Sequence, residues 1–264
     1  MNSVDLSELG PVTQLTPIAG GDINDAYRCE LGGRTVFVKW QDRPLPGLFE
    51  AEAAGLAWLR GPLRVPEVIA FADHWIALEW LELSGRPDPR RFGTQLAQLH
   101  ALGAPSFGLD RTSYLAMLAT DNTPEDDWPT FYVERRLRPL CMHLGVEREL
   151  DQLRARPELF GPAESPARLH GDLWWGNVGA VGGEPVIFDP AVLGGHRELD
   201  LAMLALFGDL PEALIAGYEE VTPLAEGWRQ RLALNQLLPL AAHACLFGGG
   251  YGARVVRGLA TCLA

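Results

Sequence analysis

The chain of 264 residues contains a single lysine, Lys39, and its other 21 basic residues are arginines. Positive charge is scarce overall, because 34 Asp and Glu against 22 Lys and Arg give a formal net charge of -12. Nucleic acids and anionic membranes both bind clustered cations. We therefore expect neither as a partner, and small neutral or cationic ligands fit the acidic chain better.

Long hydrophobic runs are also missing. The longest, at 237–247, is far shorter than the roughly 20 residues of a membrane span and contains a proline and a histidine. The first ten residues lack the basic and apolar regions of a secretory signal, so we predict a cytoplasmic protein without a transmembrane helix. Four scattered cysteines form no metal-binding spacing and are predicted to be free thiols. They are Cys29, Cys141, Cys245 and Cys262.

The hydrophobic pattern changes character near residue 83. Before that point, short runs rich in β-branched and aromatic residues predict five strands. These strands span 12–18, 26–31, 35–40, 67–72 and 75–80. One helix, at 48–59, interrupts them with an apolar stripe.

After residue 83 the chain has a mostly helical pattern. The predicted helices span 91–102, 128–144, 146–156, 198–207, 211–220 and 227–247. The sequence therefore predicts an α+β fold with two lobes. The lobe at 1–82 is expected to hold an antiparallel sheet with one helix, and the lobe at 83–264 to be mostly helical.

A turn-rich segment with different chemistry lies between the helices. It reads HGDLWWGN at 170–177, and a Gly-Gly turn then leads to the run VIFD at 186–189. We expect a loop followed by two short strands. Phosphoryl transfer from ATP needs a carboxylate to orient and deprotonate the acceptor hydroxyl, and oxygen ligands for magnesium. We predict Asp172 as the base, with Asn177 and Asp189 as the magnesium ligands.

Isolated Asp and Asn residues often serve as turn and cap residues. Here three of them follow one another with the spacing of the protein-kinase pattern HRDLxxxN and DFG. Gly171 replaces the arginine, and Phe188-Asp-Pro replaces DFG. These departures resemble small-molecule kinases related to protein kinases, including aminoglycoside and choline phosphotransferases.

The single lysine has a place in this scheme. In kinases a third-strand lysine contacts the α- and β-phosphates and pairs with a glutamate of the next helix. Lys39 ends a predicted strand, and Glu52 follows in the helix, whereas Glu50 would face elsewhere. A bulkier, forked arginine could not act as a compact charge between phosphate and carboxylate. A solvated cation at a strand end is the alternative interpretation.

Two further segments are expected to bind the nucleotide. Gly20, Gly21 and Asp22 join two predicted strands and could offer backbone N–H groups to the ATP phosphates. Glu79, Trp80 and Leu81 close the last strand of the first lobe and would form the hinge that holds adenine.

The remaining candidates concern support and the acceptor. We predict His170 and Asp200 as structural support for the catalytic loop, with a helix-dipole role as the alternative for Asp200. Aromatic faces and polar edges suit a hydroxylated ligand. The candidates for acceptor contact are Trp174, His196, Arg197 and Tyr251, together with Trp128. Packed core positions are the alternative for each of them.

Longer strings in the chain resemble the fructosamine or ketosamine kinase family. They are GGDINDAYR at 20–28, FEAE at 49–52, LHGDLWWGN at 169–177, FDPAVLGGHRELDLAM at 188–203 and LFGGGY at 246–251. The resemblance implies a two-lobed kinase fold and transfer of the γ-phosphoryl group of Mg-ATP to the 3-hydroxyl of a ketosamine. The 3-phosphate is unstable and frees the amine, so the implied activity is deglycation of a small glycated amine or lysine. We also expect the chain to be a monomer.

Two alternatives stay open. A kinase of the same fold could act on another small alcohol, such as an aminoglycoside, choline or a sugar derivative. A nucleotide-binding pseudokinase is less favoured, because loss of function usually removes at least one of the catalytic residues, and all five are present here. They are Lys39, Glu52, Asp172, Asn177 and Asp189.

Overall fold

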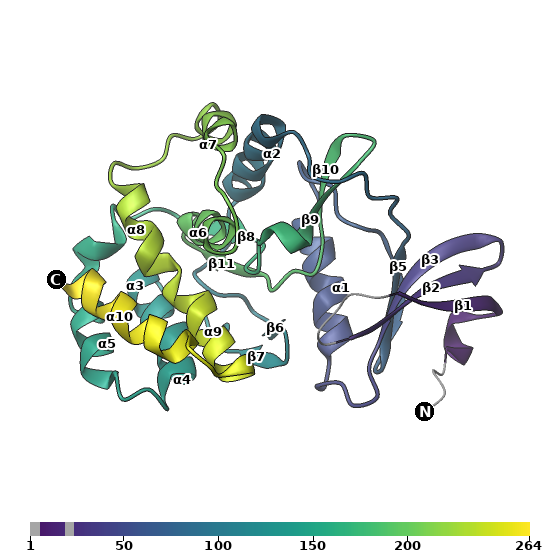
Figure 1. The fold of residues 1–264 in the computed structure, drawn as a ribbon, viewed down its shortest axis with the longest axis horizontal. Coiled ribbons are helices and arrows are strands. Elements are labelled where there is room, and N and C mark those ends of the chain that lie inside the picture. The colour runs from purple at the N-terminus through teal and green to yellow at the C-terminus, as the bar shows by residue number, and fades with distance from the viewer. Residues whose placement is uncertain (1–5, 19–23) are drawn as a thin grey trace.

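The computed structural model describes residues 6–18 and 24–264. An antiparallel sheet forms the N-terminal part, with strand order β1-β2-β3-β5-β4 (Figure 1). Its strands are β1 (Val12–Ile18), β2 (Asp25–Leu31), β3 (Arg34–Trp40), β4 (Val68–Ala72) and β5 (Trp75–Glu79). A short 3-10 turn, η1 (Ser7–Leu9), precedes them. All five predicted strands are confirmed to within one residue at each end.

Helix α1 (Leu48–Leu59) has the predicted bounds and lies between the sheet and the helical part (Figure 1). Successive side chains of a strand point to opposite faces. In β3, Val36 and Val38 therefore pack into a small core on the outer face. Phe37 packs against the main core, and Lys39 points to the same side as Phe37, toward α1.

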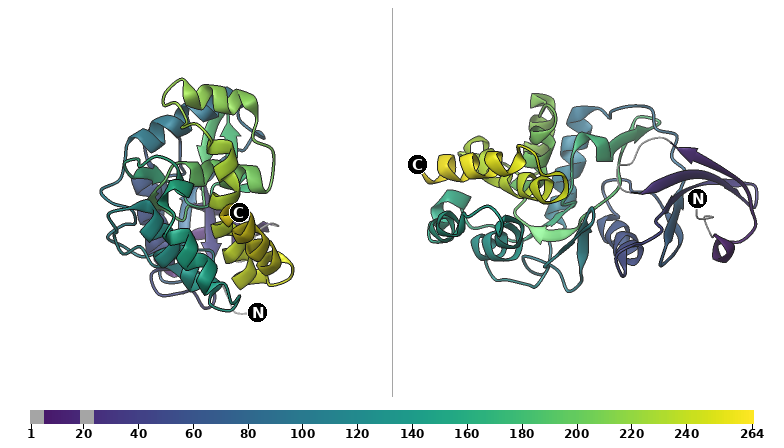
Figure 2. Two further views of the ribbon diagram at one scale, coloured as in Figure 1. Left: turned by 90° about the vertical axis from the view of Figure 1, so that its left-hand side faces the viewer. Right: turned by 60° about the horizontal axis from the view of Figure 1, so that its bottom comes forward.

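The C-terminal part is mostly helical, as predicted. Its helices are α2 (Pro89–Ala101), α3 (Trp128–Thr130), α4 (Arg138–Cys141), α5 (Glu147–Arg154), α6 (Glu198–Leu206), α7 (Glu212–Glu219), α8 (Trp228–Asn235), α9 (Leu237–Phe247) and α10 (Tyr251–Leu263). A π-helical turn η2 (Phe131–Leu137) joins α3 to α4, and 3-10 turns η3 (Pro157–Phe160) and η4 (Trp175–Asn177) complete the set. Figure 2 shows α10 at the end of the molecule far from the sheet.

Three helix predictions need correction. The segment 227–247 forms two helices, because Pro239 lacks the N–H that a continuous helix would donate to the carbonyl of Asn235. The segment 128–144 is helical only to Cys141 and passes through the π-helical turn before Pro139. Helix α10 was not predicted, since two glycines at 252 and 258 weaken its helical pattern.

Short strands organise the middle of the chain. The predicted pair after the catalytic loop is β9 (Val178–Val181) with β10 (Glu184–Ile187). Two further antiparallel pairs are β6 (Ser113–Leu115) with β7 (Leu118–Thr120), and β8 (Ala167–Leu169) with β11 (Leu193–Gly195). Each of these four strands has three residues, too few to show a period of two in the sequence.

The main hydrophobic core joins the sheet side to the helical side. It includes Leu56 of α1, Ile76 of β5, Phe92 of α2 and Leu201 of α6, all fully buried. A second core packs α5, α9 and α10 together. Because the first core is shared, α1 is held against the helical part. The lobe boundary at 82/83 stays a prediction.

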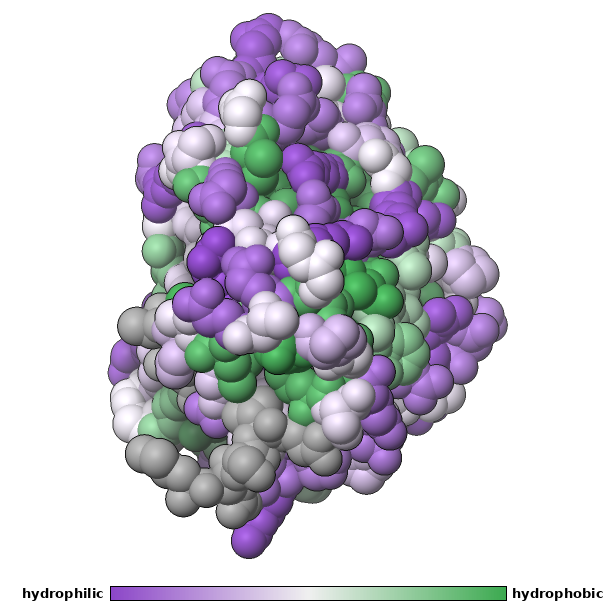
Figure 3. Space-filling model, turned by 90° about the vertical axis from the view of Figure 1, so that its right-hand side faces the viewer, coloured by the Kyte–Doolittle hydropathy of each residue, from purple (hydrophilic) through white to green (hydrophobic). Residues whose placement is uncertain are grey.

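The surface seen from the sheet end is largely hydrophilic, with hydrophobic residues gathered near its middle (Figure 3). All four cysteines are free thiols, as predicted. Within residues 6–18 and 24–264, no helix has both the length and the apolar composition that crossing a bilayer requires.

Candidate active site

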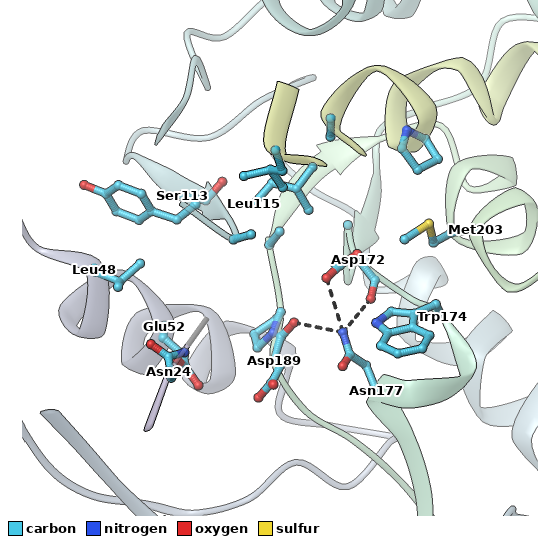
Figure 4. A pocket seen from close by; sticks show the side chains of 18 of the residues that line it. Asn24, Leu48, Glu52, Ser113, Leu115, Asp172, Trp174, Asn177, Asp189 and Met203 are labelled. Atoms are coloured by element: carbon cyan, nitrogen blue, oxygen red, sulfur yellow. Dashed lines mark hydrogen bonds between the residues drawn. The ribbon is translucent and has the colours of Figure 1, made fainter. Parts of the chain in front are cut away.

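A cavity of about 420 Å³ lies between the sheet and the helical part (Figure 4). Side chains from β3, α1, the β6–β7 hairpin, the catalytic loop, α6 and α9 line it. The five residues predicted for phosphoryl transfer lie up to 150 positions apart in the chain, and all contribute to this lining. They are Lys39, Glu52, Asp172, Asn177 and Asp189.

Lys39 forms the centre of a buried ion-pair cluster. Its Nζ lies 2.6 Å from Glu52 Oε1 and also pairs with the carboxylate of Asp189. Burial disfavours the ammonium charge, but the carboxylates of Asp189 and Glu52 outweigh it and hold the pKa of Lys39 above its usual value. The predicted pairing with Glu52 is confirmed, and Glu50 is exposed.

The β8–β11 pair brings the two catalytic loops together. Leu169 is opposite Leu193 in this pair, and the Ala191 N–H donates to the His170 carbonyl oxygen at 2.9 Å. Gly171 has φ +83°, and a Cβ there would lie 2.0 Å from the Ala191 carbonyl oxygen. Only glycine fits this close approach, which explains the departure from the arginine of protein kinases.

Asn177 links the two catalytic aspartates. Its Nδ2 donates to the Asp172 backbone oxygen at 2.9 Å, to Asp172 Oδ2 at 3.3 Å and to the Asp189 backbone oxygen at 3.4 Å (Figure 4). Burial and the nearby Asp189 carboxylate raise the pKa of Asp172 to about 7. A carboxylate with a pKa near neutrality is suited to accept a proton from a hydroxyl group.

The residues present fit a magnesium ion. Asp189 has φ +59°, a strained conformation for a residue with a side chain, which is typical of functional sites. Lys39 Nζ is hydrogen-bonded to Asp189 Oδ1, and Asn177 donates through its Nδ2. Asp189 Oδ2 and the Asn177 amide oxygen therefore remain as ligands for magnesium. In the described part of the chain, no group of three or more His, Cys, Asp or Glu could hold a metal by itself. Magnesium commonly binds through one or two protein oxygens together with substrate phosphates and water.

Asp200 supports the catalytic loop from a fully buried position. Its two carboxylate oxygens accept hydrogen bonds from the backbone N–H groups of His170 at 2.8 Å and Gly171 at 2.9 Å, and His100 Nε2 lies 3.2 Å away. The His170 ring reaches the Phe188 carbonyl oxygen at 3.0 Å. Both residues therefore make the contacts expected of structural support.

The structure brings only some of the acceptor candidates to the cavity. Trp174 lines it and is 40% exposed, and Tyr251 packs behind the lining residue His243 at 5.1 Å between ring centroids. His196 and Arg197 are buried outside this lining, and Arg197 forms a two-pronged pair with Glu164 at 2.7 Å. These two side chains, like the buried Trp128, pack within the helical part, so we leave them out of the acceptor site.

The remaining nucleotide predictions stay predictions. Gly20, Gly21 and Asp22 lie outside the described residues. Strand β5 ends at Glu79 and is followed by Trp80 and Leu81. None of these three residues lines the cavity, and the Glu79 carboxylate pairs with Arg64.

Other lining residues were missed at the sequence level. Phe207, His243 and Phe247 come from the end of α6 and from α9, and Leu115 comes from the β6–β7 hairpin. Phe247 lies within the string LFGGGY, the one signal that could have pointed to it. The others resemble ordinary helix or strand residues.

Comparison with known proteins now decides the family. The model of the fructosamine kinase family matches residues 5–264. The chain belongs to the fructosamine kinase family. The resemblance inferred from the sequence strings is therefore confirmed, and family membership makes the chain a phosphotransferase.

Individual relatives agree with this family membership. A provisionally named ketoamine kinase of Enterococcus faecium is 37% identical over 265 residues, which cover 95% of each chain. One from Lactiplantibacillus plantarum is 36% identical over 264 residues and 94% of each chain. A crystal structure from Thermobifida fusca, provisionally named a fructosamine-3-kinase, is 42% identical, with a TM-score of 0.86 over 96% of this chain and 94% of that one.

More distant structures confirm the kinase fold. The choline kinase of Streptococcus pneumoniae is 16% identical, with a TM-score of 0.66 over 97% of this chain and 95% of that one. At this identity the likeness concerns the fold alone. The predicted α+β, two-lobed kinase-like architecture is thus confirmed for this member of the fructosamine kinase family.

Proposed function

We propose that the chain transfers the γ-phosphoryl group of ATP to the 3-hydroxyl of a ketosamine, and so promotes deglycation. One observation carries this proposal: Lys39, Glu52 and Asp189 meet Asp172 and Asn177 in a single cavity. The names of the relatives point to ketoamines as the acceptor class.

Each residue has a distinct role in the proposed reaction. Asp172 orients the acceptor hydroxyl and takes its proton as the new oxygen–phosphorus bond forms and the bond to ADP breaks. Lys39, held by Glu52, neutralises charge on the α- and β-phosphates. Asn177 and Asp189 would hold magnesium, which supplies further neutralisation of the phosphate charge. Because the transition state is loose, positioning and electrostatics supply most of the rate.

Loss of the sugar follows from the position of the new phosphate. Loss of a proton from C1 converts the ketosamine to its 1,2-enol, from which the phosphate on C3 leaves as inorganic phosphate. Water then hydrolyses the resulting imine at C1 and releases the free amine. Metabolite or protein repair would be the result.

The test is turnover of Mg-ATP by the purified chain with several acceptors. Ribulose and fructose adducts of lysine are compared with an aminoglycoside and choline, and Asp172→Asn serves as the inactive control. We expect turnover with the ketosamines and later appearance of free amine. Activity on choline or the aminoglycoside alone would be consistent with phosphoryl transfer from ATP but would reject ketosamines as the acceptor class.

A further inference from the structure

The acceptor end of the cavity differs in chemistry from its phosphoryl end. Four aromatic side chains, Trp174, Phe207, His243 and Phe247, form a continuous row there. Their ring centroids are 6.5 Å apart from Trp174 to Phe207, 4.9 Å from Phe207 to His243 and 5.4 Å from His243 to Phe247. This aromatic row begins two residues after the proposed base and leads outward along α9.

The aromatic row is unusually exposed for large apolar groups. Trp174 is 40% exposed, Phe207 36% and Phe247 54%. Leaving such rings in water forgoes the free energy that burial of apolar surface provides. Exposed aromatic faces inside a cavity are therefore typical of a surface that a ligand covers.

Charge is absent from the aromatic row. Among the described residues, the charged side chains that line the cavity are Lys39, Glu52, Asp172 and Asp189, all at the phosphoryl end. The His243 ring donates from Nδ1 to the Pro239 carbonyl oxygen at 2.7 Å, so it is anchored within its own helix. A charged group bound against the aromatic row would lose its hydration without gaining an ionic partner.

A ketosamine with its 3-hydroxyl at Asp172 has two arms that extend from the reacting carbon. One arm is the polyhydroxyl chain, and the other runs through C2 and C1 to the amine and its substituent. In Figure 4, Trp174 and Met203 lie on one side of Asp172, while Asp189 and Glu52 lie toward the other. The polyhydroxyl arm needs hydrogen-bond partners, of which the aromatic row offers few, so the aromatic row is left for the other arm.

We propose that the aromatic row is the subsite for the amine substituent, and that it selects ketosamines whose amine carries an uncharged apolar or aromatic group. The inference rests on the proposed function and narrows its substrate class. The four-carbon chain of a lysine side chain also meets the condition, whereas a charged group close to the amine does not.

In the part of the chain that the structure describes, charged side chains are found again beyond the end of the aromatic row. A more open depression next to Phe247 is lined by Asp25, Asp42 and Arg43, and Asp42 pairs with Arg43 at 3.9 Å. Both signs of charge occur there, so this depression does not favour one charged substituent. Selection by the aromatic row therefore acts on the part of the substituent nearest the sugar.

The test uses three fructose adducts that share a benzyl group and differ at its para position, which carries hydrogen, a carboxylate or an aminomethyl group. The amines are benzylamine, 4-(aminomethyl)benzoate and 4-(aminomethyl)benzylamine, and kcat/KM is measured with saturating Mg-ATP. We expect the benzylamine adduct to exceed both charged adducts by at least about tenfold, the order of discrimination that an apolar pocket achieves. Equal values, or a preference for either charged adduct, would overturn the inference while leaving the proposed function intact.

Variants of Phe247 sharpen the test. Phe247→Ala should lower kcat/KM for the benzylamine adduct and narrow the difference among the adducts, and Phe247→Asp should shift preference toward the cationic adduct. Phe71→Ala is the matched control, since Phe71 lies on β4 outside the cavity and is 46% exposed. Unchanged ratios in both Phe247 variants would also overturn the inference. Absence of turnover with all three adducts would reject the proposed function and, with it, this inference.

Discussion

Lys39 Nζ lies 2.6 Å from Glu52 Oε1, and the same ammonium group pairs with the carboxylate of Asp189. These contacts join the sheet, helix α1 and the loop after β10 at one buried point. Gly55, one turn after Glu52, packs closely against this loop, since a Cβ added there would lie 3.4 Å from the side chains of Pro190 and Val192. The glutamate is thus placed by packing as well as by charge.

Replacement of the single lysine tests its role. We expect Lys39→Arg to lower kcat/KM for ATP at least about tenfold, because a forked guanidinium does not fit between Glu52 and Asp189. Steady-state kinetics with varied ATP measure the effect. Arg34→Lys at the exposed start of the same strand is the control and should stay within about twofold, as surface ion pairs contribute little. Unchanged kinetics in Lys39→Arg would make the lysine incidental.

The proposed base can be separated from nucleotide binding. Asp172→Asn should reduce kcat at least about a hundredfold, the typical contribution of a general base. ATP affinity should be retained, because Lys39 and Glu52 are untouched. Single-turnover kinetics and calorimetric titration with ATP measure the two quantities. Near-normal turnover would remove Asp172 as the base, and loss of ATP binding would assign it a different role.

The position of Trp174 can be changed without altering the residue itself. A Cβ at Gly176 would lie 2.2 Å from the Trp174 ring, so Gly176→Ala must displace the indole. We expect the KM for the ketosamine to rise about tenfold, as small misplacements in a site cost much, while the KM for ATP stays unchanged. Gly250→Ala is the control, because φ there is -79° and no atom lies within 4 Å of the added Cβ. Equal KM values for the ketosamine in Gly176→Ala and Gly250→Ala would exclude Trp174 from the acceptor site.

Asp200 should matter for stability and for its dependence on pH. Its buried carboxylate accepts hydrogen bonds from two backbone N–H groups, and Asp200→Asn places an amide N–H against one of them. We expect the free energy of unfolding at pH 7 to fall by about 3 kcal/mol. Urea denaturation measures this loss, and Asp110→Asn, whose side chain is 80% exposed, serves as the control.

The sign of the pH effect follows from the pKa of Asp200. Burial disfavours its charge, but hydrogen bonds from His100 and the loop backbone outweigh burial and lower the pKa of Asp200 below its usual value. The stabilisation is therefore present above the unfolded pKa of about 3.9 and is lost as the pH falls through the lower folded value. Acidification below about pH 5 should cost the natural chain more stability than Asp200→Asn. If acidification lowered the free energy of unfolding equally in the natural chain and in Asp200→Asn, the lowered pKa of Asp200 would be contradicted.

Local patterns in the sequence predicted much of the fold. Helix α1 has the predicted bounds and the five strands of the sheet differ by no more than one residue, because alternation and helical stripes are set by residues a few positions apart. Helix ends were harder to predict. Whether Pro139 and Pro239 bend, break or start a helix depends on how the neighbouring turns pack.

The chemistry of the catalytic residues was also readable from the sequence alone. Residue type and spacing determined that Lys39, Asp172, Asn177 and Asp189 form one set, since phosphoryl transfer needs those groups. Only the tertiary structure showed which residues line the acceptor end of the cavity. Phe207 and Phe247 are exposed in the cavity although the sequence did not single them out, whereas the predicted candidates His196 and Arg197 are buried outside its lining. Which side of a helix faces a cavity depends on packing between segments far apart in the chain. No local sequence pattern encodes that packing.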